Sequence, residues 1–404
     1  MDILGRTTPI AIGERTKSKD KKMNSIILQQ PGKIVFGINA LEKLPEDELI
    51  LSSEKILFLI AEPVLNLLQP IINQLISIGK IVEVITYNFP GEPTFKQFDT
   101  LLAQSVEFNP DCVIGVGGGS VLDSAKLLAA MTGNEQQYAD VVGVGLLKKR
   151  MKKLICISTT SGTGSEVSPI AILLNEKTEA KSGIVSPALL ADAAYIDPIL
   201  TVGLPPKITA ETTMDALCHC IEAYTNKFAH PAVDTYALKG IELISKNLLN
   251  AFNDGNDLEA RAALALGSMY GGLCLGPVNT HGVHCLSYGL GGKFHISHGL
   301  ANAILLPAVL RFNLEASPER HAEVAVAMGI ANEKDNKATA LKGIEKIEEL
   351  SFACGIPSSL TALGIGENDL PALADIAMNV TRLLKNNPRE LTREDAIGIY
   401  KTIV

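Results

Sequence analysis

Short apolar runs alternate with amphipathic segments through the first half of the chain. The runs KILFLIA (55–61) and CVIGV (112–116) are almost wholly apolar, which is typical of strands buried on both faces. Residues 66–79 and 94–109 repeat apolar side chains three and four positions apart, which is the spacing of one helix face. Further strands are predicted at 80–87, 154–159 and 193–198. Strands separated by helices predict a mainly parallel, doubly wound sheet of the Rossmann-like kind.

The pattern changes after the segment TVGLPP (201–206). Beyond it the apolar spacing is helical, and no segment has the alternation of a strand. The two prolines mark a boundary, because proline restrains the residue before it to extended conformations and can occupy the first position of a helix. We therefore predict an α/β domain at 23–204 and an all-helical domain at 205–404. Residues 1–22 contain no compact apolar segment, so we expect them to be a disordered or non-native extension.

Composition and charge narrow the range of functions. Of the 404 residues, 47% are hydrophobic and 20% are charged, so there is enough apolar material for two large cores. The net charge of −8, with one short basic run at 148–153, argues against a nucleic-acid partner. The apolar run ANAILLPAVL is about half as long as a membrane span needs, so no membrane partner is expected.

The seven cysteines include no C-x-x-C pair. Neither a disulfide framework nor a zinc site built from thiolates is therefore indicated. Reduced thiols fit a cytoplasmic location best.

A glycine-rich segment follows one of the predicted strands. In VIGVGGGSVLDSAK (113–126), Gly117, Gly118 and Gly119 lead into a helix that Ser120 begins. Backbone N–H groups and the positive end of the helix then face one small space, which suits a pyrophosphate. The segment lacks the strict G-x-G-x-x-G spacing, so a tight turn without a ligand is the alternative.

A second loop, STTSGTGSEVSP (158–169), also follows a predicted strand. It offers the hydroxyl groups of Thr159, Thr160, Ser161 and Thr163. Ligands of open α/β sheets bind at the carboxyl ends of the strands. Two such loops on neighbouring strands therefore favour a cofactor that carries phosphate.

The segment MDALCHCIE (214–222) places a carboxylate in an apolar helix. Asp215 and His219 are four residues apart and share one helix face. A buried aspartate is costly unless it is paired, hydrogen-bonded or bound to a metal. Four of the seven histidines lie in residues 280–303, namely His281, His284, His295 and His298. A single histidine on an apolar helix is more often a core residue, but one carboxylate with several imidazoles suits Fe(II) or Zn(II).

Four separated segments occur in a characteristic order and spacing: GGGSVLDSAK, TTSGTGSEVSP, MDALCHCIEAY and GVHCLSYGLGGKFHISHGLANAILLPAVLRFN. Together they resemble the iron-containing (group III) alcohol dehydrogenase family, which includes lactaldehyde reductase. The resemblance extends from Lys33 to Leu363. It implies a dehydroquinate synthase-like architecture, in which NAD(P) lies in a cleft between an α/β dinucleotide-binding domain and a helical domain that binds metal and substrate.

The resemblance also implies which residues form the site. The metal ligands would be Asp215, His219, His284 and His298. The cofactor would contact Glu62, Gly117, Gly118, Gly119, Ser120, Asp123, Thr159, Thr160, Thr163 and Lys181. Catalytic contributions would come from His284, Tyr288 and His295.

Three positions depart from the family pattern. Tyr288 stands where many members have a second histidine near the nicotinamide, so we expect its phenol to donate a hydrogen bond, with His295 as the alternative proton carrier. Ala61 and Glu62 stand where many NAD-using members have an aspartate that binds the ribose. A Glu62 that reaches the ribose favours NAD, whereas one that faces solvent admits NADP. Glu92, in GEPT, stands where relatives often have asparagine.

The resulting hypothesis is reversible hydride transfer between NAD and a small primary or secondary alcohol or diol, with Fe(II) or Zn(II) as Lewis acid and NADP as the alternative cofactor. An enzyme like dehydroquinate synthase or glycerol phosphate dehydrogenase would need a phosphate-binding pocket, and the helical half shows no clear set of Arg and Lys residues for one. A metallohydrolase would not need the two cofactor loops. A catalytically silent binding protein is disfavoured because all four metal ligands are present. Since relatives are commonly dimers or larger, a homodimer or higher homo-oligomer is expected.

Overall fold

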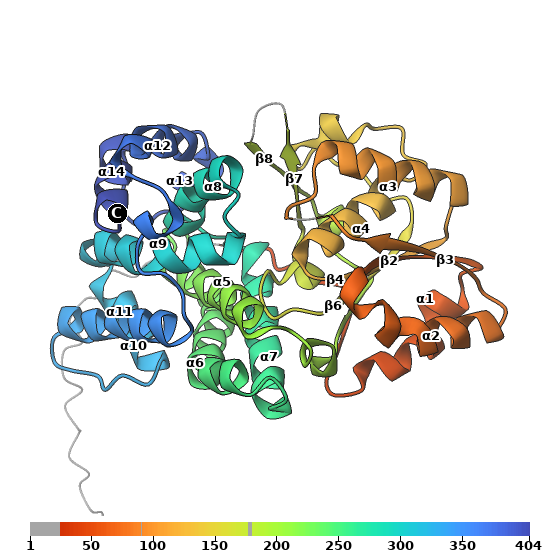
Figure 1. Cartoon of the computed structure of the whole chain (residues 1–404), viewed down its shortest axis with the longest axis horizontal. Coiled ribbons are helices and arrows are strands. Elements are labelled where there is room, and N and C mark those ends of the chain that lie inside the picture. The colour runs from red at the N-terminus through yellow and green to blue at the C-terminus, as the bar shows by residue number, and fades with distance from the viewer. Residues whose placement is uncertain (1–24, 90, 177–179) are drawn as a thin grey trace, which may run out of the picture.

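The computed structural model describes residues 25–89, 91–176 and 180–404, so the extension predicted at 1–22 lies outside the described residues. A six-stranded sheet forms the centre of the α/β part (Figure 1). In spatial order its strands are β1 (Lys33–Phe36), β9 (Ala193–Ile196), β6 (Lys153–Ser158), β4 (Cys112–Gly117), β2 (Lys55–Ala61) and β3 (Ile81–Tyr87). Every adjacent pair is parallel, which confirms the predicted parallel sheet.

Helices cover both faces of this sheet because side chains alternate along each strand. The even-numbered side chains of β2 share a core with α2 (Leu65–Ser77). The odd-numbered ones pack into a second core with α3 (Phe95–Phe108) and α4 (Gly119–Met131). The apolar run of β2 is therefore continuous, as expected for a strand that is buried on two sides.

A second, smaller sheet lies between the α/β part and the helices (Figure 1). It contains β5 (Gly143–Val144), β8 (Ala180–Val185) and β7 (Ile170–Asn175), with β7 and β8 antiparallel. The sequence pattern predicted neither these strands nor β1. In β8 the residues Lys181, Ser182 and Gly183 have a composition that is uncommon in strands, so pairing with β7, and not local propensity, defines it.

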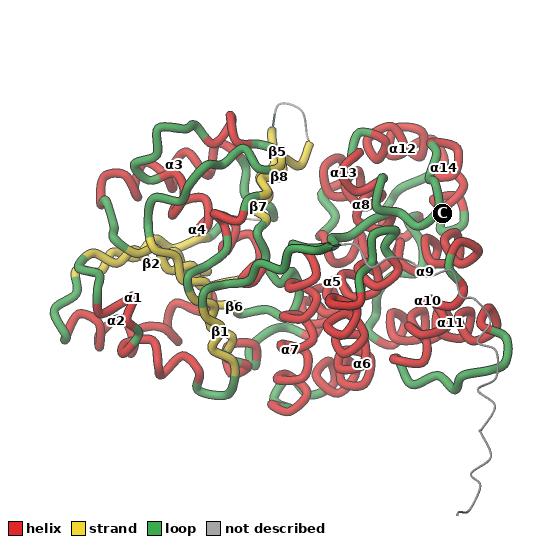
Figure 2. The backbone as a smooth tube through the Cα atoms, turned by 180° about the vertical axis from the view of Figure 1, so that it is seen from behind, coloured by secondary structure: helices red, strands yellow, loops and turns green. Residues whose placement is uncertain are grey.

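Beyond β9 the described chain forms helices joined by loops and no strand, which confirms the predicted all-helical half (Figure 2). The longer ones are α5 (Pro206–Thr225), α6 (Pro231–Asn253), α7 (Leu258–Leu275), α8 (Gly282–Phe294), α9 (His298–Asn313), α10 (Pro318–Ala327), α11 (Asn336–Ala353), α12 (Leu370–Met378) and α14 (Arg393–Lys401). Helix α5 lies at the centre, where it contacts α6, α7 and α9, and every residue from 213 to 225 is buried. No helix in the described part of the chain is long and apolar enough to cross a membrane.

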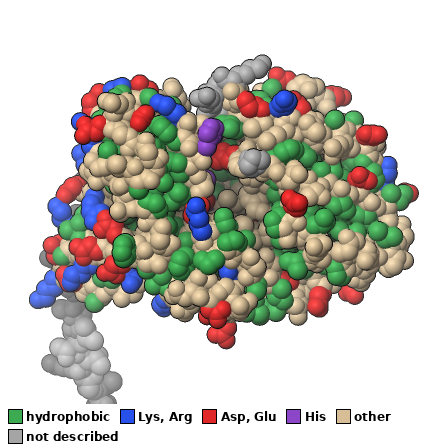
Figure 3. Space-filling model, in the orientation of Figure 1, with side chains coloured by type: hydrophobic (Ala, Val, Ile, Leu, Met, Phe, Trp, Pro, Cys, Tyr) green, Lys and Arg blue, Asp and Glu red, His purple; other side chains and the backbone are tan. Residues whose placement is uncertain are grey.

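The carboxyl ends of β4 and β6 meet at one edge of the large sheet, where Gly117 pairs in register with Ser158. The glycine loop after β4 and the hydroxyl-rich loop after β6 therefore lie side by side. The second loop also touches the helical part, since a Cβ on Gly162 would lie 2.7 Å from Thr212 Cβ on α5. Histidine side chains reach the surface at the boundary between the two parts (Figure 3).

Candidate active site

Four side chains from three helices converge on one point. Asp215 and His219 lie one turn apart on α5, His284 lies on α8, and His298 is the first residue of α9. The Nε2 atoms of His219, His284 and His298 lie 3.8, 3.4 and 3.7 Å from Asp215 Oδ1. One donor atom from each of the four residues lies within 4.8 Å of all the others. We call these four residues the cation cluster.

The spacing of the donor atoms fits a divalent cation. Separations of 3.4 to 3.8 Å are longer than those of ordinary N–H···O hydrogen bonds. Ligands placed about 2.0–2.2 Å from a tetrahedrally coordinated cation are about 3.3–3.6 Å apart. One carboxylate oxygen and three imidazole nitrogens are also the donor types that suit Fe(II) or Zn(II).

The protonation of the cluster also suits a cation. Burial alone would raise the pKa of Asp215, but the neighbouring histidines hold it well below its usual range. Burial lowers the pKa of His219, and burial together with the charge of Lys181 lowers that of His298. Asp215 is therefore ionised near neutral pH, while these two rings are neutral and can offer a lone pair.

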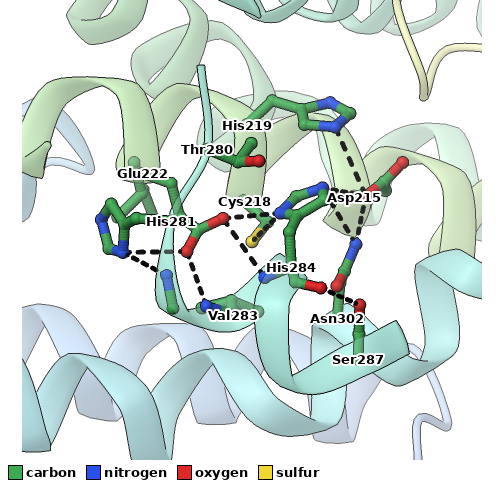
Figure 4. A network of polar contacts seen from close by, with 12 residues as sticks. Asp215, Cys218, His219, Glu222, Thr280, His281, Val283, His284, Ser287 and Asn302 are labelled. Atoms are coloured by element: carbon green, nitrogen blue, oxygen red, sulfur yellow. Dashed lines mark hydrogen bonds and ion pairs between the residues drawn. The ribbon is translucent and has the colours of Figure 1, made fainter. Parts of the chain in front are cut away.

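A second buried carboxylate lies behind His284. Glu222, on α5, accepts a hydrogen bond at Oε2 from His284 Nδ1 at 2.6 Å (Figure 4). Its Oε1 accepts from the Val283 N–H at 2.6 Å and lies 3.0 Å from His281 Nδ1. His284 Nδ1 therefore keeps its proton, and Nε2, which faces Asp215, is the nitrogen that a cation can bind. A carboxylate in this position orients a metal-binding histidine and makes it more basic.

Cation binding is expected to release a proton from His284. Burial alone would lower the pKa of His284, but hydrogen bonds and charges from Asp215 and Glu222 raise it to about 9. A cation must displace that proton, so its affinity should rise about tenfold per pH unit between about pH 6.5 and 8.5. Competition with a chelator for Zn(II) at three pH values measures this rise. An affinity that is constant over the interval would contradict it.

The two cofactor loops pack directly against each other. A Cβ on Gly119 would lie 2.7 Å from Thr163 Cγ2, and one on Gly118 would lie 3.3 Å from Thr160 Cγ2. Glycine therefore lets the backbone at the start of α4 come this close to the loop after β6. The N–H groups of Val121 and Leu122 donate to the Gly118 carbonyl, whereas those of Gly119 and Ser120 come before the first helical hydrogen bond of α4. We call the space between Gly119 and Ser120 of α4 and Thr163 of the loop after β6 the cradle. A space of this kind can hold a phosphate group.

The cation cluster and the cradle line one cavity of 710 Å³ between the α/β and helical parts. The predicted site residues that line it are Gly119, Ser120, Asp123, Thr163, Lys181, Asp215, His219, His284, Tyr288, His295 and His298. The predicted residues Gly117, Gly118, Thr159 and Thr160 do not line the cavity, although they belong to the same two loops. Glu62 is exposed just after β2 and is also outside the lining.

Polar side chains border the cavity next to the cation cluster. Lys181 forms an ion pair with Glu92, so the departure at that position supplies a partner for the lysine. Lys181 Nζ lies 3.5 Å from His298 Nδ1 and 5.3 Å from the centre of the Tyr288 ring. His295 is exposed at the end of α8, where its φ of 55° lies in the left-handed region.

Two residues of the site were not predicted from the sequence. Glu222 falls seven positions after Asp215 and three after His219, so it shares their helix face, and this spacing could have revealed it. Arg382, on α13 (Thr381–Leu384), lines the cavity, although no motif surrounds it. Together with Lys181 of β8 it gives the cavity lining two cationic side chains, of which Arg382 alone comes from the helical half.

Comparison with known proteins places these features in a family. Residues 31–198 match the family model described as iron-containing alcohol dehydrogenase, and residues 209–404 match that of the C-terminal part of the Fe-containing alcohol dehydrogenase family. Long-chain-alcohol dehydrogenase 1 of Geobacillus thermodenitrificans is 38% identical over 372 residues, which cover 90% of this chain and 93% of that protein. The 1,3-propanediol dehydrogenase of Klebsiella pneumoniae is 36% identical over 292 residues, which cover 73% of this chain and 75% of that protein. A crystal structure of a 1,3-propanediol oxidoreductase has a TM-score of 0.90 at 32% identity and covers 94% of this chain and 100% of its own.

Proposed function

The chain belongs to the iron-containing alcohol dehydrogenase family, and on that premise we propose which residues carry its reaction. It is an NAD-linked alcohol and aldehyde oxidoreductase. We assign the cation to Asp215, His219, His284 and His298. We place the pyrophosphate of the cofactor at the first turn of α4. We propose that the cation is Fe(II), with Zn(II) as the alternative. The predicted homo-oligomer, domain boundaries and cytoplasmic location stay predictions.

One observation carries this proposal: the cation cluster and the cradle line the same cavity. A metallohydrolase needs only the first of these two sites. A dinucleotide-binding protein without chemistry needs only the second. Hydride transfer needs both, because the alcohol carbon must lie against the nicotinamide while the alcohol oxygen is polarised.

The chemistry divides between the bound groups and the chain. When bound, the cation supplies Lewis-acid polarisation of the substrate oxygen, and NAD accepts a hydride in the oxidative direction. Overall, the alcohol loses a hydride from carbon and a proton from oxygen, which gives the aldehyde or ketone and NADH. The side chains of the cluster hold the cation, while the small residues of the cradle let the cofactor approach the sheet edge.

We assign to Tyr288 the transfer of the proton of the substrate oxygen. Tyr288 lines the cavity, and Arg382 Nη2 donates to its hydroxyl oxygen at 3.4 Å. Because that contact uses a lone pair of the oxygen, the phenol O–H is left to donate to another acceptor in the cavity. Tyr288 can therefore hydrogen-bond the substrate oxygen, with His295 at the rim as the alternative route to solvent.

The proposal predicts metal-dependent oxidation of NADH by short aldehydes. The chain, loaded anaerobically with Fe(II) or Zn(II), is assayed at 340 nm with NADH or NADPH against propanal, butanal and 3-hydroxypropanal. Oxidation that is lost after chelation and restored by the cation is the expected result. Faster oxidation of NADH than of NADPH would support a role for Glu62 at the ribose. A protein that binds the cation and NADH but reduces none of these carbonyls would contradict the proposal.

A further inference from the structure

Arg382 places an unpaired positive charge in the cavity. Its contact with the Tyr288 hydroxyl, at 3.4 Å, is long for a hydrogen bond. Its Nη1 atom is buried and has no hydrogen-bond partner among the described residues. A buried donor that belongs to a charged group is costly to leave unpaired. A guanidinium in such a position is therefore expected to meet an acceptor that a ligand brings.

The carboxylates that line the cavity do not neutralise Arg382. Glu92 already pairs with Lys181. Asp123 is held within the α/β part by a hydroxyl, a backbone N–H and a buried lysine. Asp215 lies among three imidazoles in the cation cluster. In the part of the chain that the structure describes, Arg382 is thus the cation of the cavity lining that has no carboxylate partner.

Tyr288 connects Arg382 to the reacting end of the cavity. Its ring lies against Lys181, whose Nζ is 3.5 Å from His298 Nδ1. Its hydroxyl meets Arg382 at the other end. A substrate a few carbons long that lies along Tyr288 could therefore place one oxygen at the cation cluster and a second polar group at the guanidinium.

We propose that Arg382 selects aldehydes and alcohols whose far end carries a carboxylate or a sulfonate. This inference rests on the proposed function and names the substrate class of the same site. A guanidinium presents two parallel N–H donors, which match the two oxygens of a carboxylate, and the pairing is stronger away from bulk water. Reduction of such an aldehyde consumes NADH and one proton, forms the alcohol, and leaves the anionic group unchanged.

The test compares aldehydes of equal length with and without the anionic group. The metal-loaded chain is assayed with 4-oxobutanoate against butanal, and with 5-oxopentanoate against pentanal. The ratio of kcat/KM, anionic over neutral, should be tenfold or more for at least one length. In Arg382→Met this ratio should fall at least tenfold, mainly through a higher KM for the anionic aldehyde. Arg382→Lys should keep part of the preference, because it retains the charge but loses the paired donors.

The matched control is Arg393→Met, which removes an exposed arginine of α14 that pairs with Asp375. It should leave the ratio unchanged. A wild-type ratio of one or less at both lengths would overturn the inference, and this result needs no variant to fold. The inference would also fail if Arg382→Met lowered kcat/KM equally for the anionic and the neutral aldehyde, since Arg382 would then act through Tyr288. It would fail as well if the variant raised only the KM for NADH, since Arg382 would then bind the cofactor. Failure to reduce any of the four aldehydes would instead defeat the proposed function itself.

Discussion

His284→Ala should abolish cation binding and reduce turnover by at least about 10³-fold, which corresponds to about 4 kcal/mol of barrier. The imidazole of His284 lies between Asp215 and Glu222, at 3.4 and 2.6 Å. The amide nitrogen of Asn302 lies 3.2 Å from His284 Nε2, but an amide N–H group donates and cannot replace the imidazole as a ligand. Loss of the imidazole leaves three donors and an open side, so the cation would be weakly held and poorly placed. The measurement pairs metal content after gel filtration with NADH oxidation by butanal.

His230→Asn is the matched control for this variant. His230 caps the start of α6 by accepting from the Ala232 N–H, and it does not line the cavity. Asparagine can make the same cap, so this variant should keep its cation and its turnover. Thermal unfolding of both variants separates a lost ligand from a lost fold. Full activity in His284→Ala would refute the ligand assignment.

Glu222→Gln should weaken cation binding by about 10–100-fold while leaving NADH binding unchanged. Burial alone would raise the pKa of Glu222, but His281 and His284 hold it well below its usual range, so the carboxylate is charged. The negative charge of Glu222 keeps the proton on His284 Nδ1 and thereby increases the electron density at Nε2. The neutral amide keeps one acceptor oxygen but loses that charge. Dissociation constants for Zn(II), measured by chelator competition at fixed pH, give the effect directly.

A positioning role can be separated from a merely structural one. With Co(II) in place of the native cation, the visible d–d absorption should shift in Glu222→Gln, because the orientation and basicity of His284 change. Glu242→Gln, on the surface of α6, removes a carboxylate that pairs with two lysines and should change neither affinity nor spectrum. If Glu222→Gln lost thermal stability but kept the affinity and spectrum of the wild type, Glu222 would serve the core and not the cation.

Much of the fold followed from local patterns. The continuous apolar run of β2 and the helical spacing of α2 and α3 were predicted within one or two residues of their observed ends. The strand β8 was not predicted, because its polar residues become a strand only through pairing with β7. That missed strand matters for the site, since it carries Lys181 to His298 and Tyr288.

The sequence by itself determined the parallel sheet, the all-helical second half, and the placement of Asp215 and His219 on one helix face. These follow from patterns within single segments: the period of apolar side chains, glycines where the backbone must pass closely, and a carboxylate one helical turn from a histidine. The choice of His284 and His298 among the four clustered histidines was implied only by the resemblance to the family, and the fold brings these two to Asp215. Only the tertiary structure decided that Glu222 supports His284, that Glu92 pairs with Lys181, and that Arg382 reaches the cavity. Each of these contacts joins residues far apart in the chain, and such contacts depend on how helices and strands pack, which the spacing within a single segment does not encode.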